Sequence, residues 1–503
     1  MIRFGSGHRR ADADSARSGF AARWNAIVNL IGAIVAITGA AMLAPMSIAA
    51  IYGEWSDAWM MLLTSLTTMA LGLIGRRTFR HSEDVSMVQA FGAVGLAWFV
   101  MAAFGALPYL VTGSLPTVTD AFFESASGFT ATGSSVAVDL TSLSHGILFW
   151  RALTQWLGGM GVIVLAVTLL PLIGVGAVQL ATAEAPGPIP ERLTPRFKET
   201  ARRIWLVYAA FTVIQVVLLT VGEMNLFEAA THSLTTISGG GFGTRADSIG
   251  AFSAYSQWIV IVFMVIGGTS FALHYRGLRN PIQYLQNTEF RLYMSILALF
   301  SAAVVIGTWG SSAHTTIRDA VFTVSSILTT TGFATADFGE WQPALQLVIL
   351  GLMFVGAMAG STSGSVKVFR LEVLLSDSRA YLHRLLHPRG IFAIRSGRSP
   401  VTDDLARSVR VFAMLYLFAF MTGTVLLGMI GSLAGMRIDI VSSASAVAAS
   451  LGNVGPGLEM VGPTHSFSTI PGLGKWLLST LMIVGRLEVL PVMLLFTREF
   501  WRH

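Results

Sequence analysis

The chain has 503 residues, of which 53% are hydrophobic and only 12% are charged. Soluble domains carry about 25% charged residues, so this chain lacks the polar side chains that a water-soluble globule of its size needs. The composition therefore predicts an integral membrane protein. The absence of cysteine excludes disulfides, zinc–thiolate sites, iron–sulfur clusters and thiol catalysis. The formal net charge of +6 does not indicate nucleic-acid binding, because the basic residues are spread over six separate segments.

Ten apolar stretches reach or approach the length of about 20 residues that a helix needs to cross a bilayer. They are 24–52, 57–75, 88–112, 146–172, 204–222, 254–273, 292–309, 343–360, 411–434 and 473–497. The first stretch follows a basic start, but it is too long and too far inside the chain for a signal peptide, so we expect a retained helix.

The basic residues are distributed unevenly between the connecting segments. One side receives 27 of the 33 lysines and arginines, and the other side receives five. The basic segments are 1–23, 76–87, 173–203, 274–291, 367–410 and 498–503. Because positively charged loops stay in the cytoplasm, we expect both termini to be cytoplasmic, which fits an even number of spans.

Four segments on the side poor in basic residues share one plan: a short amphipathic stretch, a turn rich in Ser, Thr and Gly, and a new apolar run. They read DAFFESASGFTATGSSV from Asp120, EAATHSLTTISGGGFGT from Glu228, DAVFTVSSILTTTGFAT from Asp319 and DIVSSASAVAASLGNVGPG from Asp439. Each amphipathic stretch is too short to cross a bilayer, which favours a re-entrant half-helix. A single copy is more often an ordinary tight turn, but four copies on one side favour a repeated pore element.

Aligning the four turns brings Gly133, Gly240, Gly332 and Gly455 into register, at spacings of 107, 92 and 123 residues. Irregular backbone at membrane depth is tolerated only where protein buries it or water reaches it. Four turns around one axis present carbonyl oxygens that can replace the hydration shell of a cation, and glycine allows the positive φ that directs successive carbonyls inward.

We therefore predict an all-α polytopic membrane protein of ten transmembrane helices, with four helix–half-helix–helix repeats that can surround one central axis. The predicted parts are a basic segment with two additional helices (1–80) and the repeats 81–175, 176–280, 281–400 and 401–503.

The residues of these turns resemble the TrkH/KtrB superfamily of bacterial potassium uptake proteins, within its Trk branch. The segment from Asp120, with FWRALTQWLGGMGVIVL from Phe149, TTTGFATAD from Thr329 and NVGPGLE from Asn453, is similar to the family's pore repeats. GSTSGSVKVFRLEVL from Gly360 resembles its interrupted inner helix, and VGRLEVL from Val484 resembles its last helix. The similarity runs from about residue 20 to the C-terminus.

The resemblance implies that the four pore repeats are related by pseudo-fourfold symmetry. It implies potassium uptake across the bacterial inner membrane by a gated, channel-like subunit. It also implies a homodimer with one pore in each subunit, a cytoplasmic nucleotide-binding ring of the TrkA type as partner, and no organic cofactor in this chain. The residues implied to bind potassium are Thr130, Ala131, Thr132, Gly133, Ser238, Gly239, Gly240, Thr330, Thr331, Gly332, Asn453, Val454 and Gly455.

Two turns depart from the family pattern. Gly239 stands where threonine is more frequent, and Gly452 stands where asparagine is common. These departures leave the strictness of discrimination between potassium and sodium open. Serine at the first filter position is associated with sodium-conducting relatives, and glycine at position 133 therefore favours potassium.

Two features below the turns suggest a gate. Gly356, Gly360 and Gly364 interrupt the eighth apolar stretch, where each glycine costs about 1 kcal/mol relative to alanine. We expect 356–366 to form a mobile flap across the pore; the alternative is close helix packing. Arg486 lies midway along the last stretch, too far from either end to reach water. The residues assigned to the gate are Gly360, Ser361, Thr362, Ser363, Gly364, Lys367 and Arg486.

We expect Arg486 to face the pore, repel cations and hydrogen-bond the carbonyls of the flap. The alternative is a buried ion pair with Glu223, Glu124 or another acid. Arg151 is predicted to form an ion pair, and His232 is interpreted as a packed side chain rather than a proton sensor. Asp120, Glu124, Glu228 and Asp319 are assigned either to cation attraction at the pore mouth or to helix N-termini.

Two other functions compete with a passive channel. A secondary transporter coupled to protons or sodium also uses broken helices and repeats, but usually two repeats rather than four. A membrane enzyme acting on lipid needs a cluster of catalytic side chains or metal ligands, and the ten histidines of this chain are scattered. The pattern favours the channel.

Overall fold

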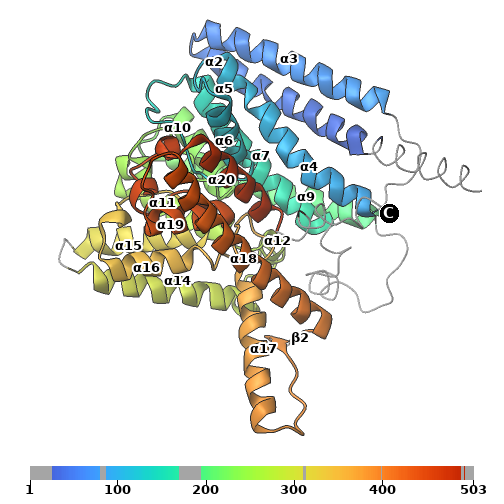
Figure 1. Cartoon of the computed structure of the whole chain (residues 1–503), viewed down its shortest axis with the longest axis vertical. Coiled ribbons are helices and arrows are strands. Elements are labelled where there is room, and N and C mark those ends of the chain that lie inside the picture. Colours follow the sequence, from blue (N-terminus) through green and yellow to red (C-terminus); the bar gives the residue numbers. More distant parts are fainter. Residues whose placement is uncertain are drawn as a thin grey trace, which may run out of the picture. The chain divides into compact units, whose positions relative to one another are not determined.

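The computed structural model describes residues 25, 27–79, 87–168, 194–309, 313–397, 399–488 and 492 (Figure 1). In these ranges the regular structure is helical except for one short antiparallel hairpin of β1 (Arg395–Ser396) and β2 (Ser399–Pro400). The chain divides into two compact units. One comprises Met1–Ala121, Ser144–Trp150 and Leu490–His503, and the other comprises Phe122–Leu143 and Arg151–Val489.

The first unit is built on two antiparallel helices, drawn in blue in Figure 1: Ile27–Ile51, which ends in α2 (Leu43–Ile51), and α3 (Trp55–Thr78). They pack closely because small residues face each other: a Cβ added at Gly72 would lie 2.4 Å from the backbone nitrogen of Ala36. The helices α4 (Met87–Gly105) and α5 (Leu107–Val111) follow them in the chain.

The second unit contains the remaining helices, and α6 and α7 cross the division between the units. In chain order they are α6 (Val118–Phe129), α7 (His145–Thr168), α9 (Thr194–Val221), α10 (Leu226–Ile237), α11 (Ala254–Gly267), α12 (Phe271–Gly277), α13 (Ile282–Gln286), α14 (Thr288–Gly307), α15 (Ala313–Leu328), α16 (Pro343–Leu352), α17 (Val368–Leu386), α18 (Asp403–Leu433), α19 (Ile440–Leu451) and α20 (Gly472–Arg486). Short 3₁₀ turns lie at Ser248–Ala251, Phe338–Glu340, Glu459–Val461 and Phe467–Thr469.

Within the described ranges, six helices are long and apolar enough to cross a membrane, and α11 with α12 passes the same test as one broken span. The chain is thus a multi-pass helical membrane protein. The predicted stretch 254–273 differs from the structure, because the helix bends by 101° after Gly267. The stretch 343–360 is helical only to Leu352. The stretches 146–172 and 473–497 extend beyond the described residues.

The four predicted half-helices are α6, α10, α15 and α19, with 12, 12, 16 and 12 residues. At 1.5 Å per residue, each falls short of the roughly 30 Å of a bilayer core. Polar side chains cap three of them: Thr117, Asn225 and Asp439 accept hydrogen bonds from the backbone amides of Asp120, Glu228 and Ser442. These caps define where the half-helices begin and leave their C-terminal ends to the glycine-containing turns.

Candidate functional site

The turns that follow the half-helices share one backbone conformation. We call them turn one (130–133), turn two (238–241), turn three (329–332) and turn four (452–455). In each turn the second residue has a positive φ: Ala131 at 50°, Gly239 at 66°, Thr330 at 57° and Asn453 at 54°. The fourth residue also has a positive φ: Gly133 at 88°, Gly241 at 76°, Gly332 at 78° and Gly455 at 109°. Glycine tolerates this conformation without steric cost.

The register of turn two differs by one residue from the sequence alignment. Gly240 was aligned with Gly133, but the residue with the matching positive φ is Gly241. Three consecutive glycines carry no side chain that fixes their register, and this explains the error. The corrected alignment also aligns Phe242, after Gly241, with Phe333, after Gly332.

The four turns contact one another in cyclic order. The fourth residue of each turn lies so close to the third residue of the next turn that an added Cβ would approach its carbonyl oxygen. These approaches are Gly133 to Gly240 at 2.2 Å, Gly241 to Thr331 at 1.8 Å, Gly332 to Val454 at 2.1 Å and Gly455 to Thr132 at 2.9 Å. The last contact returns from turn four to turn one, so the four turns close a ring of neutral carbonyl oxygens.

The polar side chains at the turns form hydrogen bonds with one another and with the backbone, and in the contacts given next no partner is a charged residue. The hydroxyls of Thr130 and Thr132 lie 2.7 Å apart. Asn453 donates from Nδ2 to the hydroxyl of Thr132 over 2.9 Å, and Ser134 donates to the carbonyl oxygen of Gly455 over 2.8 Å. Turn four is therefore bonded to turn one through side chains as well as by close backbone approach. Oxygen atoms without net charge are suited to a monovalent cation that must also leave the site.

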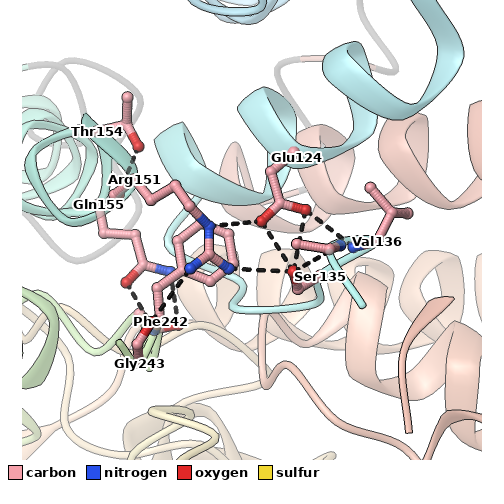
Figure 2. A network of polar contacts seen from close by, with 10 residues as sticks. Glu124, Ser135, Val136, Arg151, Thr154, Gln155, Phe242 and Gly243 are labelled. Carbon is pink, nitrogen blue, oxygen red and sulfur yellow. Dashed lines mark hydrogen bonds and ion pairs between the residues drawn. The ribbon is translucent and has the colours of Figure 1, made fainter. Parts of the chain in front are cut away.

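A buried ion pair supports turns one and two, as Figure 2 shows. Arg151 of α7 donates from Nε to Glu124 of α6 over 2.8 Å, and both side chains are buried. The Glu124 carboxylate also accepts hydrogen bonds from the hydroxyl of Ser135 and the amide of Val136, just beyond turn one. Arg151 donates from Nη1 to the carbonyl oxygen of Gly243 over 3.1 Å, just beyond turn two. The ion pair predicted for Arg151 is confirmed, and Glu124 is its partner.

An irregular loop, 353–367, joins α16 to α17. Positive φ values occur at Gly356 (72°), Gly360 (76°), Ser365 (59°) and Lys367 (63°). The predicted flap 356–366 lies inside this loop, and three residues separate it from Leu352, where α16 ends. The pattern of small residues locates the interruption because glycine and serine are poor helix formers.

The loop 353–367 forms hydrogen bonds with turns three and four and with the residue directly before turn two. The hydroxyl of Thr362 donates to the carbonyl oxygen of Ile237, directly before turn two, over 3.1 Å. The amide of Gly364 donates to the hydroxyl of Thr330 over 2.9 Å, and the hydroxyl of Ser365 donates to the carbonyl oxygen of Gly452 over 3.2 Å.

The loop also pairs with the break between α11 and α12. The amides of Thr362 and Met358 donate to the carbonyl oxygens of Gly267 and Gly268, and the amide of Phe271 donates to the carbonyl oxygen of Gly360. Two interrupted helices thus satisfy each other's backbone groups, which an irregular segment at membrane depth requires.

Arg486, at the end of α20, is buried, with 4% of its surface exposed. It donates from Nη1 to the carbonyl oxygen of Thr362 over 2.7 Å. Thr362 lies in the predicted flap, so the predicted hydrogen bond between Arg486 and a carbonyl of the flap is present. The alternative ion pairs are not formed: Glu124 binds Arg151, and Glu223 accepts a hydrogen bond from the amide of Ser253.

Two other basic side chains near the loop, Lys367 and Arg370, are paired with a carboxylate. Glu488 forms an ion pair with Lys367 over 3.2 Å and another with Arg370. Among the residues that the structure describes, no carboxylate forms an ion pair with Arg486. Within the described residues, its charge is therefore not neutralised by a direct ion pair.

The remaining predicted polar residues have local partners. Asp120 accepts a hydrogen bond from the hydroxyl of Thr117, and Glu228 forms an ion pair with Arg245 over 2.6 Å. Both acids lie in the first turns of their half-helices, where a carboxylate is stabilised by the helix dipole. His232 is fully buried, and its ring packs against Phe252 and Phe333, so its interpretation as a packed side chain is confirmed.

Comparison with known proteins identifies the family. The sequence profile of the TrkH family, described as a cation transport protein, matches residues 61–502. The chain belongs to the TrkH family. The Trk system potassium uptake protein TrkH of Halomonas elongata is 37% identical over 486 residues, which cover 95% of this chain and 99% of that relative. Its counterpart in Escherichia coli strain K12 is 35% identical over 490 residues, covering 95% and 100%.

A solved structure supports the same assignment. The crystal structure of the potassium transporter TrkH from Vibrio parahaemolyticus matches with a TM-score of 0.86 at 34% identity, over 95% of this chain and 99% of that chain. The predicted family resemblance is confirmed. The TrkH family is a family of transport proteins and not of enzymes, which sets the lipid-enzyme hypothesis aside. Among the described residues, no three His, Asp or Glu side chains gather as a metal-binding group.

Two residues of this TrkH-family chain were missed by the sequence reasoning. Gly241 was overlooked because turn two was aligned on the wrong glycine. Gln155, buried in α7, donates from Nε2 to the carbonyl oxygen of Gly240 over 2.7 Å and accepts a hydrogen bond from the amide of Phe242 over 3.0 Å (Figure 2). A polar residue four positions after Arg151 in an apolar helix was the available signal.

Proposed function

We propose that this protein takes up potassium across the bacterial inner membrane, as a gated channel-like subunit whose selectivity filter is the ring of turns one to four. The observation that carries the proposal is the cyclic close approach of the four turns, each glycine against a carbonyl oxygen of the next. A ring of backbone oxygens can replace the hydration shell of a monovalent cation. Relatives that align along nearly the whole chain are named potassium uptake proteins.

The proposed potassium-binding residues are those of the four turns, with Gly241 in place of Gly240 at the fourth position of turn two. None of the residues described in the four turns carries a positive charge. Glycine at all four fourth positions favours potassium over sodium, because no side chain narrows the ring at these points. Potassium is the transported substrate, and we propose no organic cofactor.

The proposal includes ten transmembrane helices, with four repeats of pseudo-fourfold symmetry after two additional helices. Four half-helices with equivalent turns support the repeats. The 27 basic residues on one side support cytoplasmic termini. We further propose a homodimer, and a cytoplasmic nucleotide-binding ring of the TrkA type as the regulatory partner; the family resemblance supports both.

The proposed gate is the loop 353–367 together with Arg486. The loop contacts residues of turns three and four and Ile237, the residue directly before turn two. Arg486 adds a buried positive charge beside Thr362. A positive charge next to an ion path raises the energy of a cation there, and its hydrogen bond holds the loop. Opening then requires the loop and Arg486 to separate.

Isotope uptake into vesicles containing the purified protein tests the proposal. Labelled potassium is offered with competing sodium while the membrane potential, the proton gradient and the sodium gradient are set independently. An Arg486→Ala variant serves as the opened form if the isolated chain stays closed. We expect uptake to follow the potassium gradient and the potential, with no need for a proton or sodium gradient.

The alternative function is a potassium or sodium transporter coupled to another cation or to protons. The breaks between α11 and α12 and between α16 and α17 favour this alternative, because transporters also bind ions at broken helices. It predicts that uptake collapses when the driving gradient is removed at constant potential. That result would replace the channel-like mechanism.

A further inference from the structure

Turn two lacks a side chain that the other three turns have. The third residue is Thr132 in turn one, Thr331 in turn three and Val454 in turn four, but it is Gly240 in turn two. The φ of Gly240 is not positive, so its backbone conformation is open to any L residue. The backbone conformation therefore does not explain why this position is a glycine.

The space that a side chain at position 240 would fill is occupied by Gln155. A Cβ added at Gly240 would lie 2.3 Å from Cδ, 2.4 Å from Oε1 and 2.8 Å from Nε2 of Gln155, and these are its three nearest atoms. The carboxamide of a different helix, α7, thus stands in the place of the side chain that turn two does not have.

The same carboxamide bonds to the backbone on both sides of Gly241. Its Nε2 donates to the carbonyl oxygen of Gly240, and its Oε1 accepts from the amide of Phe242. The Gly240 oxygen is also the ring oxygen that faces Gly133, 2.2 Å from its added Cβ. The Gln155 amide is therefore bonded directly to one of the four ring oxygens.

One turn of helix earlier, Arg151 anchors the next part of the same segment. Residues four apart lie on the same helix face, and Arg151 donates to the carbonyl oxygen of Gly243 while its guanidinium lies 4.1 Å from the centre of the Phe242 ring. The ion pair with Glu124 fixes Arg151 in turn. Two side chains of α7 thus form hydrogen bonds with the backbone of the segment 240–243.

We propose that Gln155 is a positioning residue for ion selectivity, which sets the orientation of the Gly240 carbonyl oxygen and replaces the side chain that turn two lacks. This inference rests on the proposed function, because it concerns the same ring. Among the hydrogen bonds of the described residues, the Gly240 oxygen accepts one from a side chain of another helix, and its counterparts in turns one, three and four do not. A buried carbonyl that loses its donor changes its orientation or takes up water, and either change alters the geometry that separates potassium from sodium.

A double-mutant cycle tests the inference in the full-length protein. The variants are Gln155→Ala, Gly240→Ser and both together, and the readout is the potassium-to-sodium uptake ratio in vesicles. We expect each single variant to lower the ratio about tenfold: Gln155→Ala removes the bonds, and Gly240→Ser displaces the carboxamide. The double variant should recover most of the ratio, because the space left by Gln155 accepts the new side chain.

Two further variants separate selectivity from folding. Gln155→Glu keeps the volume, and its ionised carboxylate puts an acceptor opposite the Gly240 oxygen. We expect selectivity to be lost at neutral pH and regained in acid, where the protonated carboxyl can donate to that oxygen in place of Nε2. Gln215→Ala is the matched control, since Gln215 of α9 is also fully buried but its amide has no hydrogen-bond partner among the described residues. We expect its uptake ratio to equal that of the unmodified protein.

The outcomes distinguish this inference from the proposed function. If Gly133→Ser abolishes selectivity while Gln155→Ala and Gln155→Glu leave the ratio unchanged, the ring stands and the role of Gln155 is refuted. The same conclusion follows if the double variant is as impaired as the two single changes combined. If neither Gly133→Ser nor any other ring variant alters the ratio, the proposed filter itself is wrong.

Discussion

Arg486 donates a hydrogen bond to the carbonyl oxygen of Thr362 over 2.7 Å, and the hydroxyl of Thr362 donates to the carbonyl oxygen of Ile237 over 3.1 Å. One residue of the loop 353–367 thus joins the last described helix to the end of the half-helix before turn two. Because Arg486 has no carboxylate partner among the described residues, its charge acts directly on any cation that approaches the loop.

Replacing Arg486 tests its proposed role in the gate. Arg486→Ala removes both the positive charge and the hydrogen bond, so we expect basal cation uptake by the otherwise closed protein to rise about tenfold or more. Arg486→Lys keeps the charge and loses the fixed guanidinium geometry, and it should give a smaller rise. The exposed Arg407 provides the control Arg407→Ala. Uptake that stays at the basal level in Arg486→Ala, at normal expression, contradicts the gate.

The contact between the loop and turn four gives a second test. A Cβ at Gly364 would lie 2.2 Å from the carbonyl oxygen of Gly452. We therefore expect Gly364→Ala to push the loop away from turn four and raise basal uptake several-fold. Gly351→Ala is a matched control, since a Cβ at Gly351 meets no atom within 4 Å. If Gly364→Ala takes up potassium no faster than Gly351→Ala, the loop does not close the path.

The proposed filter requires that selectivity depends on the close approach in the ring. Gly133→Ser adds a side chain at φ 88° and 2.2 Å from the carbonyl oxygen of Gly240, so the two turns must separate. We expect the potassium-to-sodium uptake ratio to fall about tenfold, a difference of about 1.4 kcal/mol. Gly113→Ser is the control, because Gly113 has a similar φ of 73° with no atom within 4 Å of its added Cβ. An unaltered ratio in Gly133→Ser removes turn one from the filter.

The buried ion pair of Glu124 and Arg151 is expected to support folding as well as the turns. Removing one member leaves the other as an unpaired buried charge, which costs about 3–5 kcal/mol. Glu124→Gln or Arg151→Met should therefore lower the thermal unfolding midpoint in detergent more than the double variant does. Arg203→Ala, at the exposed pair with Glu199, should leave the midpoint nearly unchanged. Equal midpoints for all these variants would contradict a structural role of the pair.

The sequence alone predicts much of this architecture because its signals are local. Apolar length marks the spanning helices, and the repeated turns mark Gly133, Gly332 and Gly455, where threonine or valine beside each glycine fixes the register. The glycine and serine run locates the loop 353–367, and the isolated Arg486 is visible as a charge within an apolar stretch.

Other features depend on contacts between distant segments. Gly241 was misplaced because three consecutive glycines give no signal that fixes their alignment. The bend after Gly267 depends on the loop 353–367, whose amides donate to the carbonyl oxygens at the bend. The proposed role of Gln155 follows only from its position against Gly240, 85 residues further along the chain. Such pairings are set by tertiary packing, and no periodic pattern within α7 encodes them.

The central claim is that the four turns surround a path for potassium. Anomalous diffraction from crystals soaked in rubidium or thallium salts, which replace potassium, tests it most directly. We expect a peak on the axis of the ring, coordinated by the carbonyl oxygens of Thr132, Gly240, Thr331 and Val454. A transport-competent protein with no peak inside the ring, or with its peaks only at other sites, would contradict the claim.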